Sequence, residues 1–229
     1  MTFSASNTAI TATHASALGS GTIIYNTSTS GQQLTLASGV TTTWANNFSF
    51  ASTASYTITL DAPSSQAGFT QTFGTAAFNQ QSNLILNQTG NLTSTGTIAF
   101  GASTFGSPNT SKTSQLSPTG VNMTISSLTP IVSNNQTATL VLDGTSAGNT
   151  IGTIADGGSG ATLNKAAITK QNTSTWTLAG TNTYTGTTTV SGGTLEIKSG
   201  ASALTQTLGV LTLAGADVTL KSNLSLIHI

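Results

Sequence analysis

The chain has 229 residues, of which 36% are hydrophobic, 6% are aromatic and 4% are charged, and its formal net charge is zero. Arginine is absent and the five lysines are scattered, so no cationic groove can bind a polyanion, and nucleic acid is excluded as a partner. Because there is no cysteine, a disulfide framework and a thiolate metal site are also excluded.

The composition favours β-structure. The chain contains 48 threonines, and the stiff χ1 of this β-branched residue suits a pleated, half-buried surface and penalises helix. Isoleucine, valine, leucine and phenylalanine recur throughout, whereas disordered chains lack such residues. The chain is therefore predicted to fold as an all-β protein.

The N-terminal residues 1–18 carry neither a basic segment nor an unbroken apolar segment, so they are not a secretory signal. No run reaches the roughly 18 apolar residues that a transmembrane segment needs. If the protein is exported, we expect its signal and its membrane pore to lie outside this chain.

Along the chain, apolar residues recur as i, i+2 pairs that are followed by turn residues, which is the signature of strands. The pairs are Leu34/Leu36, Ile58/Leu60, Leu84/Leu86, Ile98/Phe100, Met123/Ile125, Leu140/Leu142, Trp176/Leu178, Leu195/Ile197, Leu211/Leu213 and Val218/Leu220. Most successive pairs start about 14 to 26 residues apart, a spacing that suits one solenoid turn of two or three short strands.

This spacing predicts a right-handed parallel β-helix, that is, a β-solenoid, in which stacking supplies the core that one turn lacks. Strands of a sandwich recur every 8 to 12 residues. Counting weaker runs such as Ile23/Tyr25 and Phe48/Phe50 brings the chain closer to that pattern, so an antiparallel β-sandwich is the alternative. The phenylalanines of the N-terminal half are predicted to form internal stacks.

The predicted organisation has N-terminal solenoid turns over residues 1–100, a loop-rich segment over 101–130, further turns over 131–223, and a truncation or artefactual tail over 224–229. The loop is predicted because Pro108, Pro118 and Pro130 each remove a donor from a strand ladder. The tail is apolar and follows no repeat.

Residues 168–195, ITKQNTSTWTLAGTNTYTGTTTVSGGTL, place short β-forming runs between glycine and asparagine turns. This segment resembles the autotransporter-associated β-strand repeat, also called the passenger-associated transport repeat, of large secreted surface proteins of Gram-negative bacteria. The residues that carry the resemblance are Lys170, Thr175, Leu178, Gly180, Asn182, Thr183, Tyr184, Gly186, Thr188, Val190, Gly193, Thr194 and Leu195. Residues 149–170 resemble the preceding part of such repeats more weakly.

The segment departs from the family pattern at three positions. Asn172 and Ser174 stand where the family usually has glycine, and Trp176 occupies an aliphatic position. Tyr184 and Asn182 are interpreted as structural residues of the turn.

The resemblance implies a non-enzymatic segment of an autotransporter-like passenger at the cell surface of a Gram-negative bacterium. Such a segment acts as a stalk or adhesin scaffold and supports vectorial folding during secretion, and its partner is an outer-membrane translocation pore elsewhere in the full protein. The alternative is a module that binds glycans or a host surface through a lateral sheet rich in threonine and asparagine.

No catalytic, cofactor-binding or metal site is predicted. The carboxylates are separated by more than ten residues and are interpreted as turn formers, so a carbohydrate-active enzyme of the β-helix type is a lesser alternative. They are Asp61, Asp143, Asp156, Glu196 and Asp217. The two histidines, His14 and His228, lie near opposite ends of the chain, and a single glycine-aspartate segment at residues 156–160 is a turn rather than a calcium repeat.

Threonine runs suggest one further alternative, an ice-binding solenoid. The runs are residues 41–43, 181–185 and 187–189. An ice-binding face repeats such a run at one place in every turn, whereas these runs are irregular. The favoured interpretation is that hydroxyl groups hydrate an exposed sheet without charge.

Overall fold

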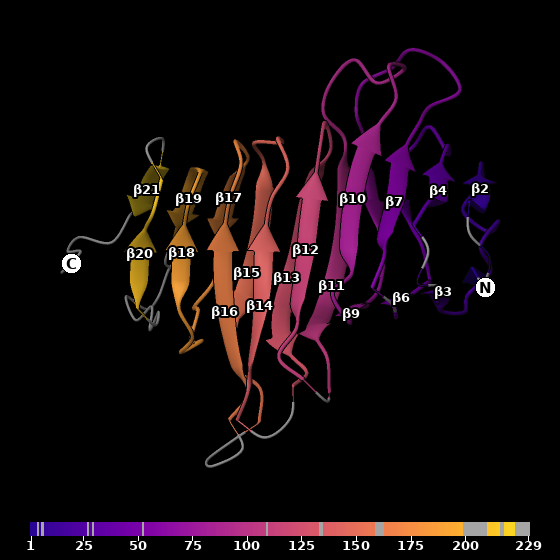
Figure 1. Cartoon of the computed structure of the whole chain (residues 1–229). Helices are drawn as coiled ribbons and strands as arrows, with labels where there is room; N and C mark the ends of the chain where they lie inside the picture. The colour runs from indigo at the N-terminus through magenta and orange to yellow at the C-terminus, as the bar shows by residue number, and fades with distance from the viewer. Residues whose placement is uncertain are drawn as a thin grey trace.

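The structure, a computed structural model, describes residues 1–3, 5, 7–26, 28, 30–51, 53–108, 110–132, 135–158, 163–198, 210–215 and 218–222. The regular elements of these residues are all β-strands, and they form two sheets that run along one elongated body (Figure 1). The predicted all-β class is confirmed.

One sheet has nine strands in the order β2-β4-β7-β10-β12-β14-β16-β18-β20. They are β2 (Ala9–Ala12), β4 (Gln32–Leu36), β7 (Ser55–Leu60), β10 (Asn83–Gln88), β12 (Thr113–Pro118), β14 (Thr137–Leu142), β16 (Lys165–Lys170), β18 (Thr188–Val190) and β20 (Leu211–Leu213).

The other sheet has twelve strands, ten of them in the order β1-β3-β6-β9-β11-β13-β15-β17-β19-β21, with β5 and β8 beside this path. They are β1 (Thr2–Phe3), β3 (Ile23–Tyr25), β5 (Thr42–Thr43), β6 (Phe48–Phe50), β8 (Thr70–Thr72), β9 (Ala76–Asn79), β11 (Thr97–Gly106), β13 (Asn122–Pro130), β15 (Asn149–Ile154), β17 (Thr175–Leu178), β19 (Gly193–Ile197) and β21 (Val218–Ser222).

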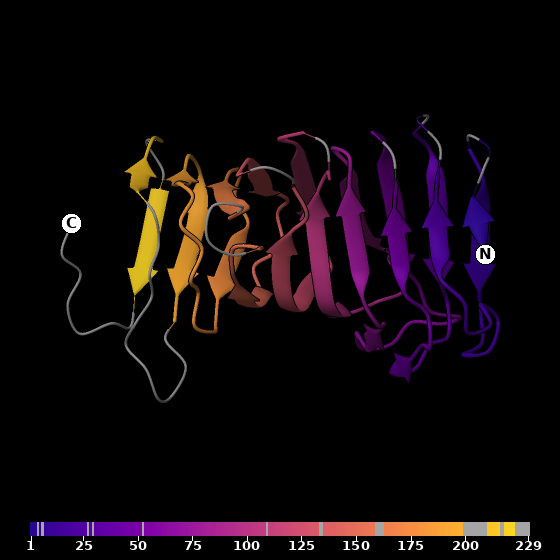
Figure 2. The same cartoon turned by 90° about the horizontal axis from the view of Figure 1, so that it is seen from below.

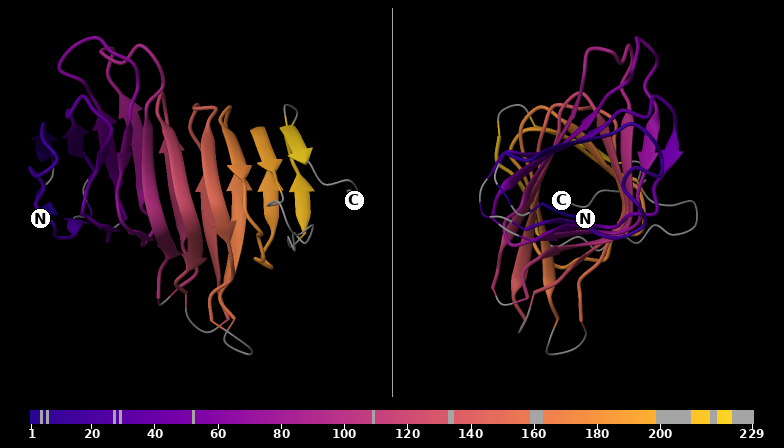
Figure 3. Two further views of the ribbon diagram at one scale, coloured as in Figure 1. Left: turned by 180° about the vertical axis from the view of Figure 1, so that it is seen from behind. Right: turned by 90° about the vertical axis from the view of Figure 1, so that its right-hand side faces the viewer.

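The chain alternates between the two sheets, and every strand pairing within them is parallel. In Figure 1 the nine-stranded sheet runs upward in front and the other sheet runs downward behind, while the chain advances from N to C; this is a right-handed coil. The view from below and the end-on view show the same stack (Figures 2 and 3). The predicted β-solenoid is confirmed, and the antiparallel sandwich is excluded because a sandwich needs antiparallel pairs.

The core fills the space between the sheets, because alternate side chains of each strand point inward. The apolar pairs that the sequence predicts in β4, β7, β10, β11, β13, β14, β17 and β19 are all buried. One inward column of the nine-stranded sheet runs in register through Leu84, Leu116, Leu142, Lys170 and Val190. The stacking of similar rungs therefore creates the core.

The N-terminal rungs pack aromatic rings on each other. Phe3, Tyr25, Phe50, Phe78 and Phe105 face one another in register on successive strands. The ring centroids of Tyr25 and Phe50 are 5.2 Å apart and those of Phe50 and Phe78 are 5.5 Å apart, both stacked. Offset stacks of this spacing are favourable beyond their buried area.

Residues 101–130, where the sequence predicts a loop, instead contain most of β11, all of β12 and all of β13. Pro118 and Pro130 are the last residues of their strands, so the donor that each of them lacks falls at the end of a ladder rather than within it. The Pro118 carbonyl still accepts from the Thr145 amide of the next rung at 3.0 Å. The prediction that residues 101–130 are rich in loops is therefore wrong, because most of them lie in strands. The division of the chain into segments stays a prediction.

Two lateral loops project from the coil above β7 and β10 (Figure 1). Residues 61–69 and 89–96 form them, and they stack on each other, since the Gln66 amide donates to the Asn91 carbonyl at 3.0 Å. The described part of the chain holds no helix of the length and apolarity needed to cross a bilayer. The predicted tail, residues 224–229, lies outside the described residues.

Candidate functional site

The residues of the repeat motif lie on two consecutive rungs. Lys170, Leu178, Val190 and Leu195 are inward residues of strands, whereas the other members occupy turns and links or, for Gly193, the start of a strand. Turn, link and strand-start members are Gly180, Asn182, Thr183, Tyr184, Gly186 and Gly193. The motif thus spans β16 to β19.

Three glycines of the motif stand where the backbone of one rung closely approaches the rung below. A Cβ on Gly180 would lie 2.1 Å from the Gly152 carbonyl oxygen, and a Cβ on Gly186 would lie 2.2 Å from the Ala166 carbonyl oxygen. Gly193 has a φ of 65°, which side-chain-bearing residues rarely adopt. Glycine at these positions permits close stacking.

Two buried polar side chains order the link between β17 and β18. Asn182 accepts a hydrogen bond from the Ile154 amide at 2.8 Å and donates to the Gly180 carbonyl at 2.8 Å. The Tyr184 hydroxyl pairs with the Thr188 hydroxyl at 2.7 Å, and burial raises the pKa of Tyr184 to about 12. Both contacts satisfy groups that water cannot reach.

Lys170 is fully buried within the inward column of the nine-stranded sheet. Its ammonium donates to the carbonyl oxygens of Gln171, Asn172 and Gly192 at 2.6, 3.1 and 3.0 Å. Burial lowers the pKa of Lys170 to about 8, and the nearby Asp143 carboxylate opposes this shift. Because Gly192 belongs to the rung above, the ammonium joins the turn after β16 to the turn after β18.

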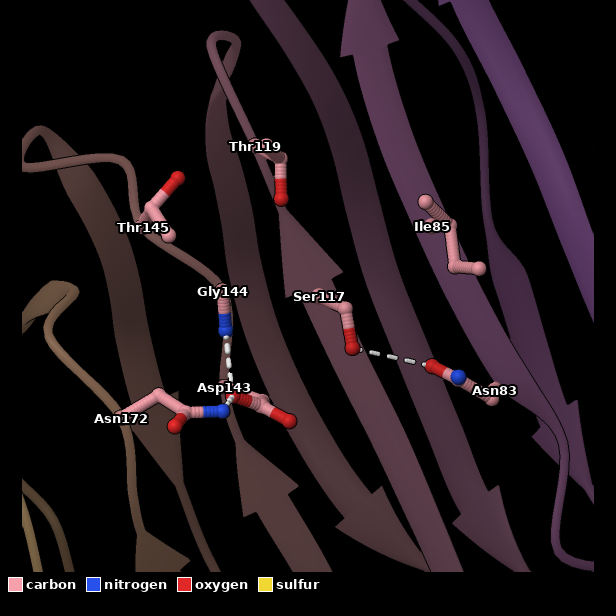
Figure 4. Close-up of a pocket in the computed structure, with 8 residues that line it drawn as sticks. All are labelled: Asn83, Ile85, Ser117, Thr119, Asp143, Gly144, Thr145 and Asn172. Carbon is pink, nitrogen blue, oxygen red and sulfur yellow. Dashed lines mark hydrogen bonds between the residues drawn. The ribbon is translucent and has the colours of Figure 1, made fainter.

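An open depression of about 280 Å³ lies on the outer face of the nine-stranded sheet, around the turn that follows β14 (Figure 4). It is lined by Asn83, Ile85, Ser117, Thr119, Asp143, Gly144, Thr145 and Asn172. Most of its polar groups bond to one another: the Ser117 hydroxyl donates to the Asn83 side-chain oxygen at 3.0 Å. The Asn83, Ser117, Asp143 and Asn172 side chains of the depression are thus already engaged with one another or with the Gly144 amide.

Asp143 is the centre of this network. Its side chain accepts from the Gln115 and Gln171 amides at 2.7 and 3.0 Å, from the Gly144 backbone amide at 2.7 Å, and from the Asn172 amide. These donors come from the rung below, its own turn and the rung above. A carboxylate with four donors has little capacity left for a ligand hydroxyl.

The described carboxylates do not assemble into a catalytic pair. Asp61 and Asp143 follow strands β7 and β14, which stand three strands apart, or roughly 14 Å at the spacing of a sheet. Paired glycosidase carboxyls lie within about 10 Å. Asp156 lies beyond the end of β15 and bonds Thr185, Glu196 pairs with Lys198 at 3.2 Å, and Asp217 lies outside the described residues.

Among the described residues, no group of three histidine, aspartate or glutamate side chains is arranged to hold a metal ion. His14 bonds Ser16 in an exposed turn, and His228 lies outside the described part. The threonine runs occupy different places: residues 42–43 form β5 in one sheet, residues 188–189 belong to β18 in the other, and residues 181–185 lie in a link.

Residues 168–197 match the family model of the passenger-associated-transport-repeat. The match extends the segment identified from the sequence by two residues and ends with β19. No curated protein and no solved structure matches the chain. The repeat family and the solenoid together fit a segment of an autotransporter passenger, a family that is not typically catalytic.

The network around Asp143 is not predicted from the sequence. The local pattern Leu142-Asp143-Gly144 indicates a turn, which the structure has, with a φ of 88° at Gly144. The donors from the neighbouring rungs stand 28 to 33 residues away along the chain. Only the approximate rung length could have brought them together in advance.

Proposed function

We propose that this chain is a non-enzymatic rod segment of an autotransporter-like passenger, which acts as a stalk or adhesin scaffold at the surface of a Gram-negative bacterium. The observation that carries this proposal is the stack of parallel rungs that contains the matched repeat. The partner in this role is an outer-membrane pore elsewhere in the full protein.

The stack supports folding in one direction during secretion. Each rung buries its inward side chains on its neighbours, so a rung that emerges from a pore can fold on the rung that emerged before it. The free energy of this stacking opposes backsliding without a nucleotide. The close glycine contacts at Gly180 and Gly186 tie the repeat to the rung beneath it.

A proline in the link of the repeat tests this role. Asn182→Pro removes the buried amide that bonds Ile154, and Gly90→Pro is the matched control, because Gly90 is the second residue of a turn closed by the Leu92 amide and the Thr89 carbonyl. Each variant is fused to an outer-membrane autotransporter pore, and surface exposure and refolding of the purified chain are measured.

We expect Asn182→Pro to lower both surface exposure and refolding, and Gly90→Pro to leave both unchanged. If Asn182→Pro leaves secretion and solenoid folding untouched, vectorial folding through the repeat is refuted. The glycan-binding or host-binding alternative stays a prediction from the sequence. The internal bonding of the depression around Asp143 gives it no additional support.

A further inference from the structure

Asp143 accepts hydrogen bonds from four side chains of the turn that opens the repeat. The Asp143 carboxylate accepts from Gln171 and Asn172, while the Asp143 backbone carbonyl accepts from the Ser174 hydroxyl at 2.8 Å and from the Trp176 indole at 3.1 Å. All four donors lie in the next rung. Asp143 itself lies outside the matched segment 168–197.

The same donors include every position at which the segment departs from its family pattern. In the pattern that the segment resembles, the positions of Asn172 and Ser174 are glycines and the position of Trp176 is aliphatic, and none of those residues has a side-chain donor. The indole nitrogen of Trp176 and the hydroxyl of Ser174 are both buried at this contact. The departures therefore form a set of donors with one common acceptor residue.

The stack needs such a contact because its rungs resemble one another. Their outward residues are mostly threonine, serine and other small side chains, and a slip of two residues keeps every inward side chain inside. Apolar burial alone specifies this register weakly. A buried carboxylate with fixed donors specifies it strongly, because a slip of β16 takes two of the four donors, Gln171 and Asn172, away from the charge.

We propose that Asp143 is the register-determining residue for the repeat: it positions the turn 171–176 on the preceding rung and fixes the alignment of β16 on β14. Leu142 and Lys170, the residues in register at this edge, directly precede the two sides of the contact. The inference concerns the folded rod and does not depend on the proposed role in secretion.

Crosslinking tests the alignment directly, since the chain has no native cysteine. In the native register Val141 faces Thr169, and after a slip of two residues Thr139 would face Thr169. The native pair is Val141→Cys with Thr169→Cys, and the slipped pair is Thr139→Cys with Thr169→Cys. Both pairs are treated with a short thiol-to-thiol crosslinker.

Each pair is placed in three backgrounds: the parent chain, Asp143→Ala, and the triple change Asn172→Gly, Ser174→Gly and Trp176→Leu. Asp61→Ala is the control, since this carboxylate also joins adjacent rungs through Thr89 and Asn91 but lies in the N-terminal half. We expect about tenfold more slipped product in Asp143→Ala and in the triple variant, and the parent ratio in Asp61→Ala.

The proposal is overturned if Asp143→Ala and the triple variant both give the native product alone. If Asp143→Ala does not fold, the milder Asp143→Asn is read in the same way, because it keeps the size of the side chain and one side-chain oxygen acceptor but removes the charge. Native product alone in Asp143→Asn then overturns the proposal, and slipped product supports it.

Discussion

The N-terminal rungs and the rungs of the repeat share one coil but hold their alignment differently. From β1 to β11 an aromatic column in register fills the interior, with Tyr25 and Phe50 at its centre. From β14 to β19 the interior is mainly aliphatic, and buried polar groups such as Asp143, Lys170 and Asn182 join the turns. Large rings fix alignment by shape, and polar groups fix it by their partners.

Aromatic and aliphatic interiors differ in how strongly they specify one alignment of the rungs. A ring column tolerates no small neighbour without leaving a cavity, whereas aliphatic side chains of similar size can exchange places. The N-terminal half also buries amides, since Gln71 accepts from the Trp44 indole at 2.6 Å and donates to the Val40 carbonyl. The difference between the halves is therefore one of proportion.

The largest effect is expected from Phe50→Ala, which removes the middle ring of the aromatic column. Truncation of a fully buried phenylalanine costs about 3–5 kcal/mol of unfolding free energy. Because rungs of a solenoid depend on their nearest neighbours, hydrogen exchange should accelerate in β3, β6 and β9 while β16 to β19 stay protected. Equal acceleration in both halves would show that the rod unfolds as one unit. Val40→Ala, at an exposed position, is the control.

A somewhat smaller effect is expected from Gly180→Ala in the repeat. The added Cβ would lie 2.1 Å from the Gly152 carbonyl oxygen, which is backbone and cannot move without displacing β15. We expect a loss of about 3 kcal/mol in urea denaturation. Gly90→Ala is the matched control, because nothing lies within 4 Å of its added Cβ. A loss at Gly90 equal to that at Gly180 would refute the close-approach explanation.

Asn182→Ala is expected to cost about 2 kcal/mol, because it leaves the buried Ile154 amide without its acceptor. Asn91→Ala is the comparison in the N-terminal half, where the exposed side chain donates to the Ala62 carbonyl at 2.8 Å. Water can replace that bond, so thermal unfolding should shift much less in Asn91→Ala. Equal shifts in the two variants would show that the buried hydrogen bond in the link of the repeat stabilises the chain no more than the exposed one in the lateral loop.

The strands that the sequence revealed are those whose inward residues are a pair of large apolar side chains, such as Leu34/Leu36 in β4. Strands with polar or small inward residues carried a weaker signal. In β12 the inward residues include Ser114 and Pro118, and in β18 they include Thr188. Period two was present there, but hydrophobicity did not mark it.

The candidate site was less accessible to sequence reasoning than the fold. The glycines and Asn182 follow from a local turn pattern, and the structure gives that pattern a cause in the close approach of rungs. The acceptor role of Asp143 depends on the alignment of residues in three rungs, and turn lengths vary too much along the chain to calculate that alignment. The turn residues could therefore be predicted from the local sequence, whereas the register between rungs could not.

The smallest effect is expected from titration of Lys170. In the N-terminal strands β7 and β10, the same inward column of the nine-stranded sheet contains the uncharged residues Tyr56 and Leu84. The pKa of Lys170 falls from 10.5 to about 8 in the folded chain, so between these values the unfolded chain binds more protons. Stability should therefore rise as the pH increases from about 8 to 10.5. Full conversion of this shift, which already includes the opposing effect of Asp143, gives about 3 kcal/mol, and screening by solvent in the open depression beside Asp143 reduces our expectation to about 1–2 kcal/mol.

The matched variant is Lys170→Met, which keeps the length of the side chain without its charge. Its stability should not rise over this pH range, and the difference between the two chains isolates Lys170 from the four other lysines. Above about pH 10 both chains should lose stability alike, because burial raises the pKa values of Tyr25 and Tyr184 and the unfolded tyrosines ionise first. Parallel curves for the two chains between pH 8 and 10 would mean that the ammonium is solvated, and that the turns of the repeat are joined by shape, as the N-terminal rungs are.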